Sequence, residues 1–285
     1  MRALPPNLET DSYFLTQLAN DARSQGNDDP TNLDSLVDCL DYLPPKERQK
    51  VSRAYKYAAY SHAGQTRRTG HAYITHPTAV AKTLAGMRMD SEAISAALLH
   101  DVIEDSEANK MILSKKFGNS VAGLVDGVSK LTKNSKARDE AQAENFQKMA
   151  LATAEDVRVV IIKLADRLHN LKTIEHLPRE KQIKKSRETL DLYAPLAHQI
   201  GMHKMAIELE DISFKTIHPI RHKMIVDALK TNDLNRKNLI SRVKKAVRKK
   251  FNDAKLNVKI TGREKRIFSI YQKMKKKKSF SDIYD

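Results

Sequence analysis

Residues 96–105 of this 285-residue chain read AALLHDVIED, an apolar helical run that ends in four polar side chains. Side chains three and four apart share a helix face, so His100 neighbours Glu104, and Asp101 neighbours both Glu104 and Asp105. Three carboxylates and an imidazole this close repel one another or lose hydration unless a positive group joins them. The stretch therefore points to a divalent metal ion, with a solvated helix end capped by His100 as the alternative.

Two further residues could complete such a site. His76 lies in YITHP (73–77), and Asp166 directly follows the apolar run VVIIKLA (159–165). Each also has an ordinary explanation, since an isolated histidine is often structural and Asp166 could pair with Arg167. Two imidazoles and two carboxylates suit Mn²⁺, Fe²⁺ or Zn²⁺, and the ligand types do not choose among them.

Helical periodicity dominates the first 215 residues. The chain holds only 9 Gly and 9 Pro, which favours long helices and argues against an all-β fold. Asp90 and Ser91 are the candidate caps of the helix that contains the opening stretch. The ranges with apolar residues at helical spacing are 8–24, 33–40, 46–63, 77–87, 92–105, 121–131, 140–152, 156–173, 180–200 and 203–215.

The pattern changes after residue 250. Leu256, Val258 and Ile260 alternate with polar residues, which is the period of a β-strand, and residues 267–274 return to helical spacing. Residues 280–284 resemble the start of another strand, and the chain stops there. We therefore expect a mainly α protein, with a helical domain followed by an incomplete α/β fragment of a longer protein.

Composition excludes several classes of protein. No apolar stretch approaches the roughly 20 residues of a membrane span, and the N-terminus lacks the apolar core of a signal peptide. The single cysteine, Cys39, cannot form an internal disulfide, and its place in an apolar helical pattern predicts a buried thiol. These features indicate a cytoplasmic protein without a membrane partner.

The net charge of +16 is concentrated towards the C-terminal end. Residues 236–278 hold 18 Lys and Arg against 2 Asp and Glu, whereas residues 1–235 hold 33 against 31. The first 235 residues are nearly neutral and need not bind polyanions by bulk charge. The basic block favours an anionic partner, such as nucleotide phosphates, nucleic acid or a neighbouring acidic domain.

Longer motifs narrow these alternatives. The order His76, His100-Asp101, Asp166 resembles that of the HD-domain metal-dependent phosphohydrolases. From about Tyr55 onward, further motifs resemble the RelA/SpoT family of (p)ppGpp hydrolase–synthetases. These motifs are RRTG (67–70), YITHP (73–77), HDVIED (100–105), GVSKL (127–131), KLADRLHN (163–170), ETL (188–190), YAPLAH (193–198), GREK (262–265) and SIY (269–271).

The resemblance implies three regions: an all-helical HD-domain hydrolase over 1–215, a helical linker over 216–250, and the N-terminal fragment of an α/β nucleotidyltransferase-like synthetase over 251–285. It implies a Mn²⁺-dependent enzyme of the stringent response, which removes the 3′-pyrophosphate of ppGpp or pppGpp and yields GDP or GTP. A C-terminal regulatory region would then be missing from this chain.

The resemblance also assigns residue roles by motif match. The metal ligands are His76, His100, Asp101 and Asp166, and the acidic pair that activates water is Glu104 and Asp105. The loop at the guanine end holds Arg67, Arg68 and Thr69. The further nucleotide contacts are Asn170 and Thr173. The chain departs from the family pattern at His71-Ala72, where the family usually has Glu-Pro.

For the synthetase, the resemblance assigns phosphate binding to Arg263, Lys265, Ser269 and Lys273, and Mg²⁺ binding to Asp285. Phosphoryl transfer needs the complete metal cradle, and the second acidic residue and the rest of the GTP site are missing. We therefore expect hydrolysis without synthesis. The alternatives are an HD phosphohydrolase that acts on a dNTP, and a non-catalytic nucleic-acid-binding module built on the basic block. Nucleic acid is not the expected partner.

Overall fold

The computed structural model describes residues 33–105, 108–132, 138–231, 233–254, 256, 258–260 and 266–276. Most of these residues are helical, as the sequence predicts. None of the helices it describes is long and apolar enough to cross a membrane. The predicted helix at 8–24 and the predicted strand start at 280–284 lie outside the described residues.

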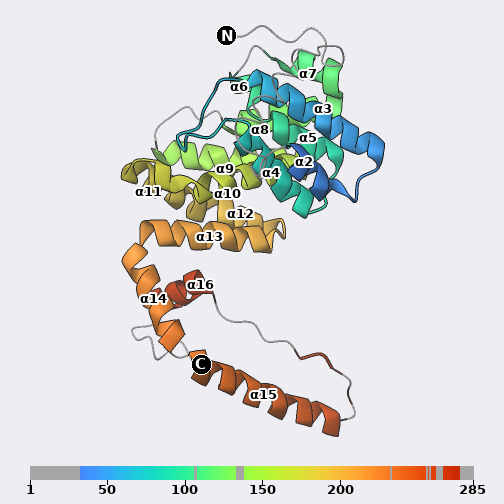
Figure 1. Ribbon diagram of the computed structural model, residues 1–285. Helices are drawn as coiled ribbons and strands as arrows, with labels where there is room; N and C mark the ends of the chain where they lie inside the picture. The colour runs from blue at the N-terminus through green and yellow to red at the C-terminus, as the bar shows by residue number, and fades with distance from the viewer. Residues whose placement is uncertain are drawn as a thin grey trace.

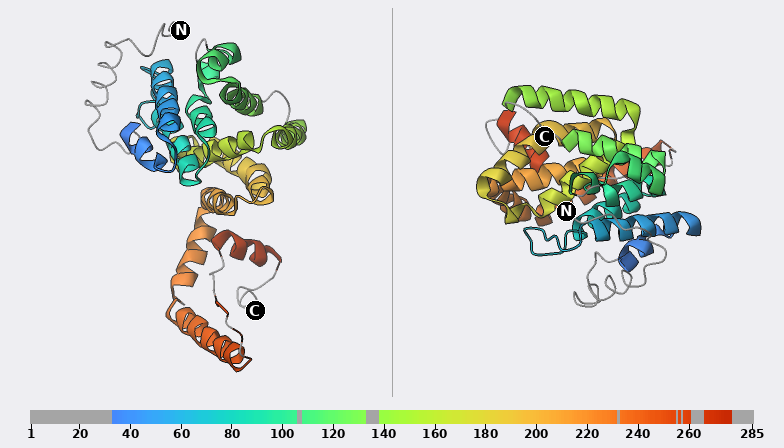
Figure 2. Two further views of the ribbon diagram at one scale, coloured as in Figure 1. Left: turned by 90° about the vertical axis from the view of Figure 1, so that its right-hand side faces the viewer. Right: turned by 90° about the horizontal axis from the view of Figure 1, so that it is seen from above.

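Helices α2 to α13 form one packed body, from which α14, α15 and α16 extend (Figures 1 and 2). The elements of the body are α2 (Leu33–Val37), η1 (Asp38–Leu40), α3 (Pro45–Ser61), α4 (Thr75–Gly86), α5 (Ser91–Leu99), α6 (Val102–Asp105), α7 (Lys110–Phe117), α8 (Asn119–Thr132), α9 (Arg138–Glu155), α10 (Val157–Lys172), η2 (Ile174–His176), α11 (Arg179–Glu188), η3 (Thr189–Tyr193), α12 (Ala194–Gln199) and α13 (His203–Ile217). The elements of the extension are α14 (Pro219–Thr231), α15 (Asp233–Asp253) and α16 (Ile267–Lys276).

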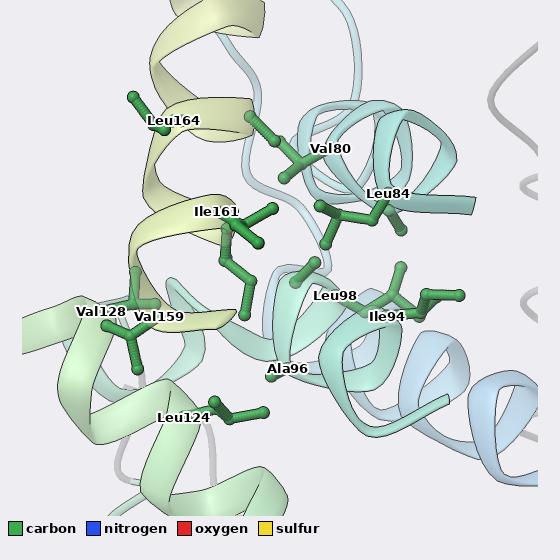
Figure 3. Close-up of a cluster of buried hydrophobic side chains, with 14 of the residues drawn as sticks. Val80, Leu84, Ile94, Ala96, Leu98, Leu124, Val128, Val159, Ile161 and Leu164 are labelled. Atoms are coloured by element: carbon green, nitrogen blue, oxygen red, sulfur yellow. The ribbon is translucent and has the colours of Figure 1, made fainter. Parts of the chain in front are cut away.

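The core of the body surrounds α5, which contacts α3, α4, α8 and α10. Every residue of α5 from Ala93 to Leu99 is buried, because its alanines let neighbouring helices approach from several sides. In Figure 3, side chains of α4, α8 and α10, such as Val80, Leu124 and Ile161, lie around this helix. The central position of α5 fixes the place of the residues that follow it directly, His100 and Asp101.

Helix α5 ends earlier than the sequence predicts. Asp90 is its cap, as predicted, and the Asp90 carboxylate accepts a hydrogen bond from Ala93 N at 2.8 Å. At the other end, His100 Nδ1 donates to Ala97 O at 2.7 Å. In a continuous α-helix that carbonyl would accept from Asp101 N. This competition accounts for the turn at His100 and Asp101, where one helix over 92–105 is predicted.

Helix α7 is not predicted by the apolar spacing of the sequence. Its boundaries nevertheless carry ordinary signals: the Asn109 side chain accepts from Ile112 N at 3.0 Å, and Gly118 follows the last residue with φ of +92°. The helix has eight residues, so its apolar positions are too few for periodicity to reveal it.

Local changes in helical winding account for two further differences. The predicted helix over 180–200 contains a π-helical turn, η3, just before Pro195. Proline lacks an N–H and crowds the preceding turn, and a wider turn accommodates both effects. Cys39 is exposed rather than buried, because the tighter turn of η1 directs Leu40 into the core instead.

Gly127 lets α8 approach α10 closely. A Cβ at this position would lie 2.9 Å from Val159 Cγ2 and 3.1 Å from Val159 Cγ1. We expect Gly127→Ala to lower the free energy of unfolding by about 1–3 kcal/mol, the usual cost of overpacking. Urea unfolding followed by circular dichroism measures this change.

Gly123→Ala, on the same helix, is the matched control. Nothing lies within 4 Å of the methyl group that it adds, and alanine is the better helix former by about 1 kcal/mol. We expect this variant to be as stable as the parent or more stable. Equal destabilisation by both substitutions would contradict the packing argument.

A second, smaller hydrophobic cluster joins the extension to the body. It contains Phe214, Ile225, Ile270 and Tyr271, from α13, α14 and α16, and the rings of Phe214 and Tyr271 stack with centroids 4.4 Å apart. Most described side chains of α15, in contrast, are exposed. The division of the chain at residues 215 and 250 stays a prediction.

The described residues of the predicted strand at 256–260 do not form a strand. Residues 256 and 258–260 are in no strand, because a strand is stabilised by backbone hydrogen bonds to a neighbouring strand and the described part of the chain supplies none. The α/β character expected of the C-terminal fragment is therefore absent from the residues that the structure describes. Within them, β-type pairing occurs at an isolated bridge between Thr66 and Ala72.

Candidate active site

The structure brings the four predicted metal ligands to one place. His76 comes from α4, His100 and Asp101 from the turn between α5 and α6, and Asp166 from α10. Donor atoms of His76, His100 and Asp101 all lie within 4.8 Å of one another. Asp166 Oδ1 lies 3.1 Å from His76 Nε2 and 3.9 Å from His100 Nε2. Ligands that bind one ion at about 2.1 Å are separated by comparable distances.

His100 provides the clearest test of whether these residues fit a metal ion. Its Nδ1 contacts the Ala97 carbonyl, which can only accept, so Nδ1 carries the proton and a neutral ring has a lone pair on Nε2. That Nε2 is buried and has no hydrogen-bond donor among the described residues. It faces Asp101 Oδ1 at 3.2 Å and Asp166 Oδ1 at 3.9 Å. A lone pair directed at two carboxylates repels them unless a cation lies between, so the donor set fits a divalent metal.

His76 is oriented by a second imidazole. Its Nδ1 lies 2.7 Å from His169 Nδ1, and its Nε2 faces Asp166 Oδ1. Burial lowers the pKa of His76, although the nearby Asp166 opposes this effect, and burial lowers the pKa of His169 to about 3. Both rings are therefore neutral near pH 7, which is the form in which imidazole binds a metal.

The two carboxylates are held by hydrogen bonds and charge. Asp166 accepts from Lys163 Nζ at 2.7 Å and from Asn170 Nδ2 at 2.5 Å. Burial raises the pKa of the Asp166 carboxyl. The nearby Lys163 ammonium opposes this effect, and the pKa lies well below its usual range. Asp101 Oδ2 accepts from the Tyr73 hydroxyl at 2.9 Å. Both carboxylates are thus ionised and oriented at neutral pH.

A cavity of about 540 Å³ lies beside this cluster. His76, Asp101 and Asp166 form part of its wall. A volume of this size lies within the range of small-molecule sites, about 300–1,000 Å³. All residues predicted to bind substrate line it as well: Arg67, Arg68, Thr69, Asn170 and Thr173.

The cavity wall also holds three cations for which the sequence predicts no binding role, Lys163, Arg167 and Lys185. Arg167 Nη2 pairs with Glu188 Oε2 at 3.0 Å, and its guanidinium lies 4.0 Å from the centre of the Tyr193 ring. Burial and the charge of Arg167 lower the pKa of Lys185. Crowded cations favour an anionic ligand. No local pattern marks Lys185, because its place at the cavity depends on the packing of α11.

The loop between α3 and α4 carries the predicted guanine-binding residues. Arg67 Nη2 donates to Asn170 Oδ1 at 2.8 Å and so fastens the loop to α10. Gly70, with φ of +86°, occupies the left-handed region that glycine favours. The departure from the family pattern at His71-Ala72 lies in the closed base of the loop, where His71 O accepts from Arg67 N at 2.9 Å.

The predicted water-activating pair is not part of the described cavity wall. Glu104 is exposed on α6, and its Oε1 accepts from Ser129 Oγ at 2.8 Å. Ser129 belongs to the GVSKL motif, so this motif supplies a hydrogen-bond donor to Glu104. Asp105 ends α6, and its side chain lies outside the described residues. The roles of Glu104 and Asp105 stay predictions.

The predicted synthetase residues lie apart from this site. Ser269 and Lys273 are exposed on α16, and neither lines the cavity. Arg263, Lys265 and Asp285 lie outside the described residues. The predicted roles of these five residues in phosphate and Mg²⁺ binding are therefore not tested by the structure.

Comparisons with known proteins identify the family to which the chain belongs. Residues 54–203 match the family described as HD domain, a span that contains all four proposed ligands. Over 255 residues the chain is 46% identical to a Vibrio cholerae protein named guanosine-3′,5′-bis(diphosphate) 3′-pyrophosphohydrolase, covering 88% of this chain and 36% of that protein. Over 249 residues it is 46% identical to the Escherichia coli K12 protein named bifunctional (p)ppGpp synthase/hydrolase SpoT, covering 85% of this chain and 35% of that protein.

A solved structure is also similar, described as a metazoan ortholog of SpoT that hydrolyzes ppGpp and plays a role in starvation responses. The match has 26% identity and a TM-score of 0.48, and it covers 59% of this chain and 96% of that one. The chain spans about a third of the length of the two curated relatives. The HD-domain match alone covers more than half of the chain. The chain therefore belongs to the HD-domain family, as a relative of the RelA/SpoT proteins.

Proposed function

We propose that the protein hydrolyses the 3′-pyrophosphate of ppGpp and pppGpp with a divalent metal ion held by His76, His100, Asp101 and Asp166. The observation that carries the proposal is the buried His100 Nε2, whose lone pair faces two carboxylates. The names of the relatives support this reaction. The positively charged cavity beside the cluster offers room for a nucleotide that carries two phosphate chains.

The chain's own residues would prepare the reacting atoms. The rings of His76 and His100 would offer Nε2 to the ion, and Asp101 and Asp166 would balance its charge. A bound divalent ion lowers the pKa of water and draws charge from phosphoryl oxygens. Water would attack the phosphorus bonded to the 3′ oxygen, and the bond between that oxygen and phosphorus would break. Pyrophosphate would leave, and the 3′ oxygen would take up a proton to give GDP or GTP.

Residues of the cavity would bind the nucleotide and move the proton. Arg67 and Lys185 can neutralise phosphate charge or, in the case of the arginine, stack on the purine. Glu104 and Asp105 are the proposed acceptors of the water proton, a contribution of about 10²–10⁴-fold. Glu104 would need to leave its hydrogen bond with Ser129 to reach the cavity.

We propose Mn²⁺ as the metal ion. The donor set of two imidazoles and two carboxylates is compatible with Mn²⁺, Fe²⁺ and Zn²⁺, and the motif resemblance favours Mn²⁺. The protein should lose hydrolysis when a chelator removes its metal and recover it with Mn²⁺. Recovery with Zn²⁺ but not with Mn²⁺ would show that the metal assignment is wrong while leaving the reaction intact.

Substrate choice is tested by incubating the protein and Mn²⁺ with ppGpp or dGTP and separating the products. Pyrophosphate released from ppGpp alone supports the proposed function. Tripolyphosphate released from dGTP supports the dNTP phosphohydrolase instead. Hydrolysis of neither nucleotide, together with RNA binding that falls steeply with salt, supports the nucleic-acid-binding module.

Arg67 should contribute to nucleotide binding through its charge and through the loop that it fastens to Asn170. We expect Arg67→Ala to raise the KM for ppGpp about tenfold to a hundredfold, since hydrogen bonds of charged groups contribute about 1.5–3 kcal/mol. Initial rates over a range of ppGpp concentrations measure this. The control is Arg242→Ala, which removes an exposed positive charge from α15. An equal rise in KM for both variants would indicate a general charge effect instead.

A further inference from the structure

The imidazole of His169 contacts a proposed metal ligand but has no role in the reaction described above. It lies on α10, three residues after Asp166, and its Nδ1 is 2.7 Å from His76 Nδ1. The two ring centroids are 4.8 Å apart. The His76 side chain is only 2% exposed, so its hydrogen bonds inside the protein decide which of its nitrogens carries the proton.

The two histidines proposed as metal ligands, His76 and His100, differ in the hydrogen-bond partner of Nδ1. His100 Nδ1 meets Ala97 O at 2.7 Å, and a carbonyl can only accept, so one tautomer is enforced. His76 Nδ1 meets a ring nitrogen at the same distance, and that nitrogen can donate or accept. The tautomer of His76 therefore depends on whether His169 Nδ1 donates or accepts this hydrogen bond.

The two arrangements have opposite consequences for a metal ion. If His169 donates, the proton of neutral His76 lies on Nε2, 3.1 Å from Asp166 Oδ1, and no lone pair remains for the ion. If His169 accepts, the proton lies on His76 Nδ1 and the lone pair on Nε2 points to the cluster. Metal binding is compatible with the second arrangement alone.

We propose that His169 is a positioning residue, whose Nδ1 accepts the hydrogen bond of His76 Nδ1–H and holds His76 in the tautomer that binds a divalent ion through Nε2. The inference rests on the metal role proposed for His76. Removing such a partner of a metal-binding histidine weakens metal affinity by about 10–100-fold.

The test compares His169→Leu with His169→Asn. Leucine fills the space without an acceptor, whereas the amide oxygen of asparagine can take the place of the ring nitrogen. His203→Leu, at an exposed position of α13, controls for the loss of an imidazole. Titration calorimetry of each full chain with Mn²⁺, without nucleotide, measures affinity. We expect His169→Leu to bind about 10–100-fold more weakly, and the other two variants to bind like the wild type.

Two outcomes would overturn the proposal: wild-type affinity in His169→Leu, or equal losses in His169→Leu and His169→Asn, which would indicate space filling instead of hydrogen bonding. If the leucine variant does not fold, His169→Ala takes its place in the same titration. A wild-type chain that binds no Mn²⁺ overturns the proposed metal site as well. Tight wild-type binding with no effect of His169→Leu overturns the role of His169 alone.

Discussion

Asp101→Ala is expected to lower the turnover of ppGpp by about a thousandfold or more. Asp101 lies 3.2 Å from His100 Nε2 and is oriented by the Tyr73 hydroxyl, so alanine removes one of the two carboxylates that would balance the charge of the proposed ion. A metal ion contributes several kcal/mol of transition-state stabilisation, and each step of about 1.4 kcal/mol is a tenfold change in rate. Pyrophosphate release measures turnover, and elemental analysis of the purified variant measures its metal content.

The control for this prediction is Asp191→Ala, at an exposed position in η3 that does not line the cavity. It removes the same chemical group and should leave both turnover and metal content unchanged. Turnover by Asp101→Ala within tenfold of the parent would show that Asp101 is not a ligand. Loss of metal without loss of turnover would separate metal binding from the reaction and contradict the proposed function.

Lys163→Met is expected to lower the free energy of unfolding by about 3–5 kcal/mol, the usual cost of leaving a buried charge without its partner. The Lys163 and Asp166 side chains are 9% and 8% exposed, with Nζ 2.7 Å from Oδ2. Methionine preserves most of the volume and removes the charge. Urea unfolding of the metal-free protein measures the change. Saturating Mn²⁺ should restore part of the stability, because a ligand that binds only the folded state stabilises it.

Lys172→Met provides a matched control on the same helix. Lys172 pairs with Glu208 at 3.0 Å, but both side chains are 51% exposed. Exposed ion pairs contribute about 0–1 kcal/mol, so this substitution should change stability little. The double variant Lys163→Met/Asp166→Leu should be more stable than Lys163→Met, since it removes the unpaired carboxylate. If it is less stable, the loss comes from packing and the charge argument fails.

Most of the helical fold could be predicted from the sequence because buried helices carry their own apolar pattern. Helix α10 is an example: the spacing predicts 156–173, and the structure has Val157–Lys172. The predicted helices differ from the structure where a local hydrogen bond or steric effect changes the winding of the helical backbone. His100 engages Ala97 O, and Pro195 widens the preceding turn. Apolar spacing contains no information on either effect.

The strand predicted at 256–260 illustrates a different limit. Alternation of apolar and polar residues indicates a strand only if a neighbouring strand is present to receive its hydrogen bonds. The described residues contain no such neighbour, so the pattern alone is insufficient. Helix α16, whose hydrogen bonds are internal, forms where the sequence predicts it and packs through Ile270 and Tyr271 on α13 and α14.

Residue types and their spacing were enough to nominate the metal ligands, because coordination chemistry is a property of imidazole and carboxylate groups wherever they lie. The surroundings of those ligands also depend on how α10 packs against α4, which is far from it in the chain, and against α11. His169 beside His76 and Lys185 beside Arg167 are the examples. No local pattern encodes such distances, since they result from the packing of the whole core, and they determine the partner of His76 Nδ1 and the charges that line the cavity.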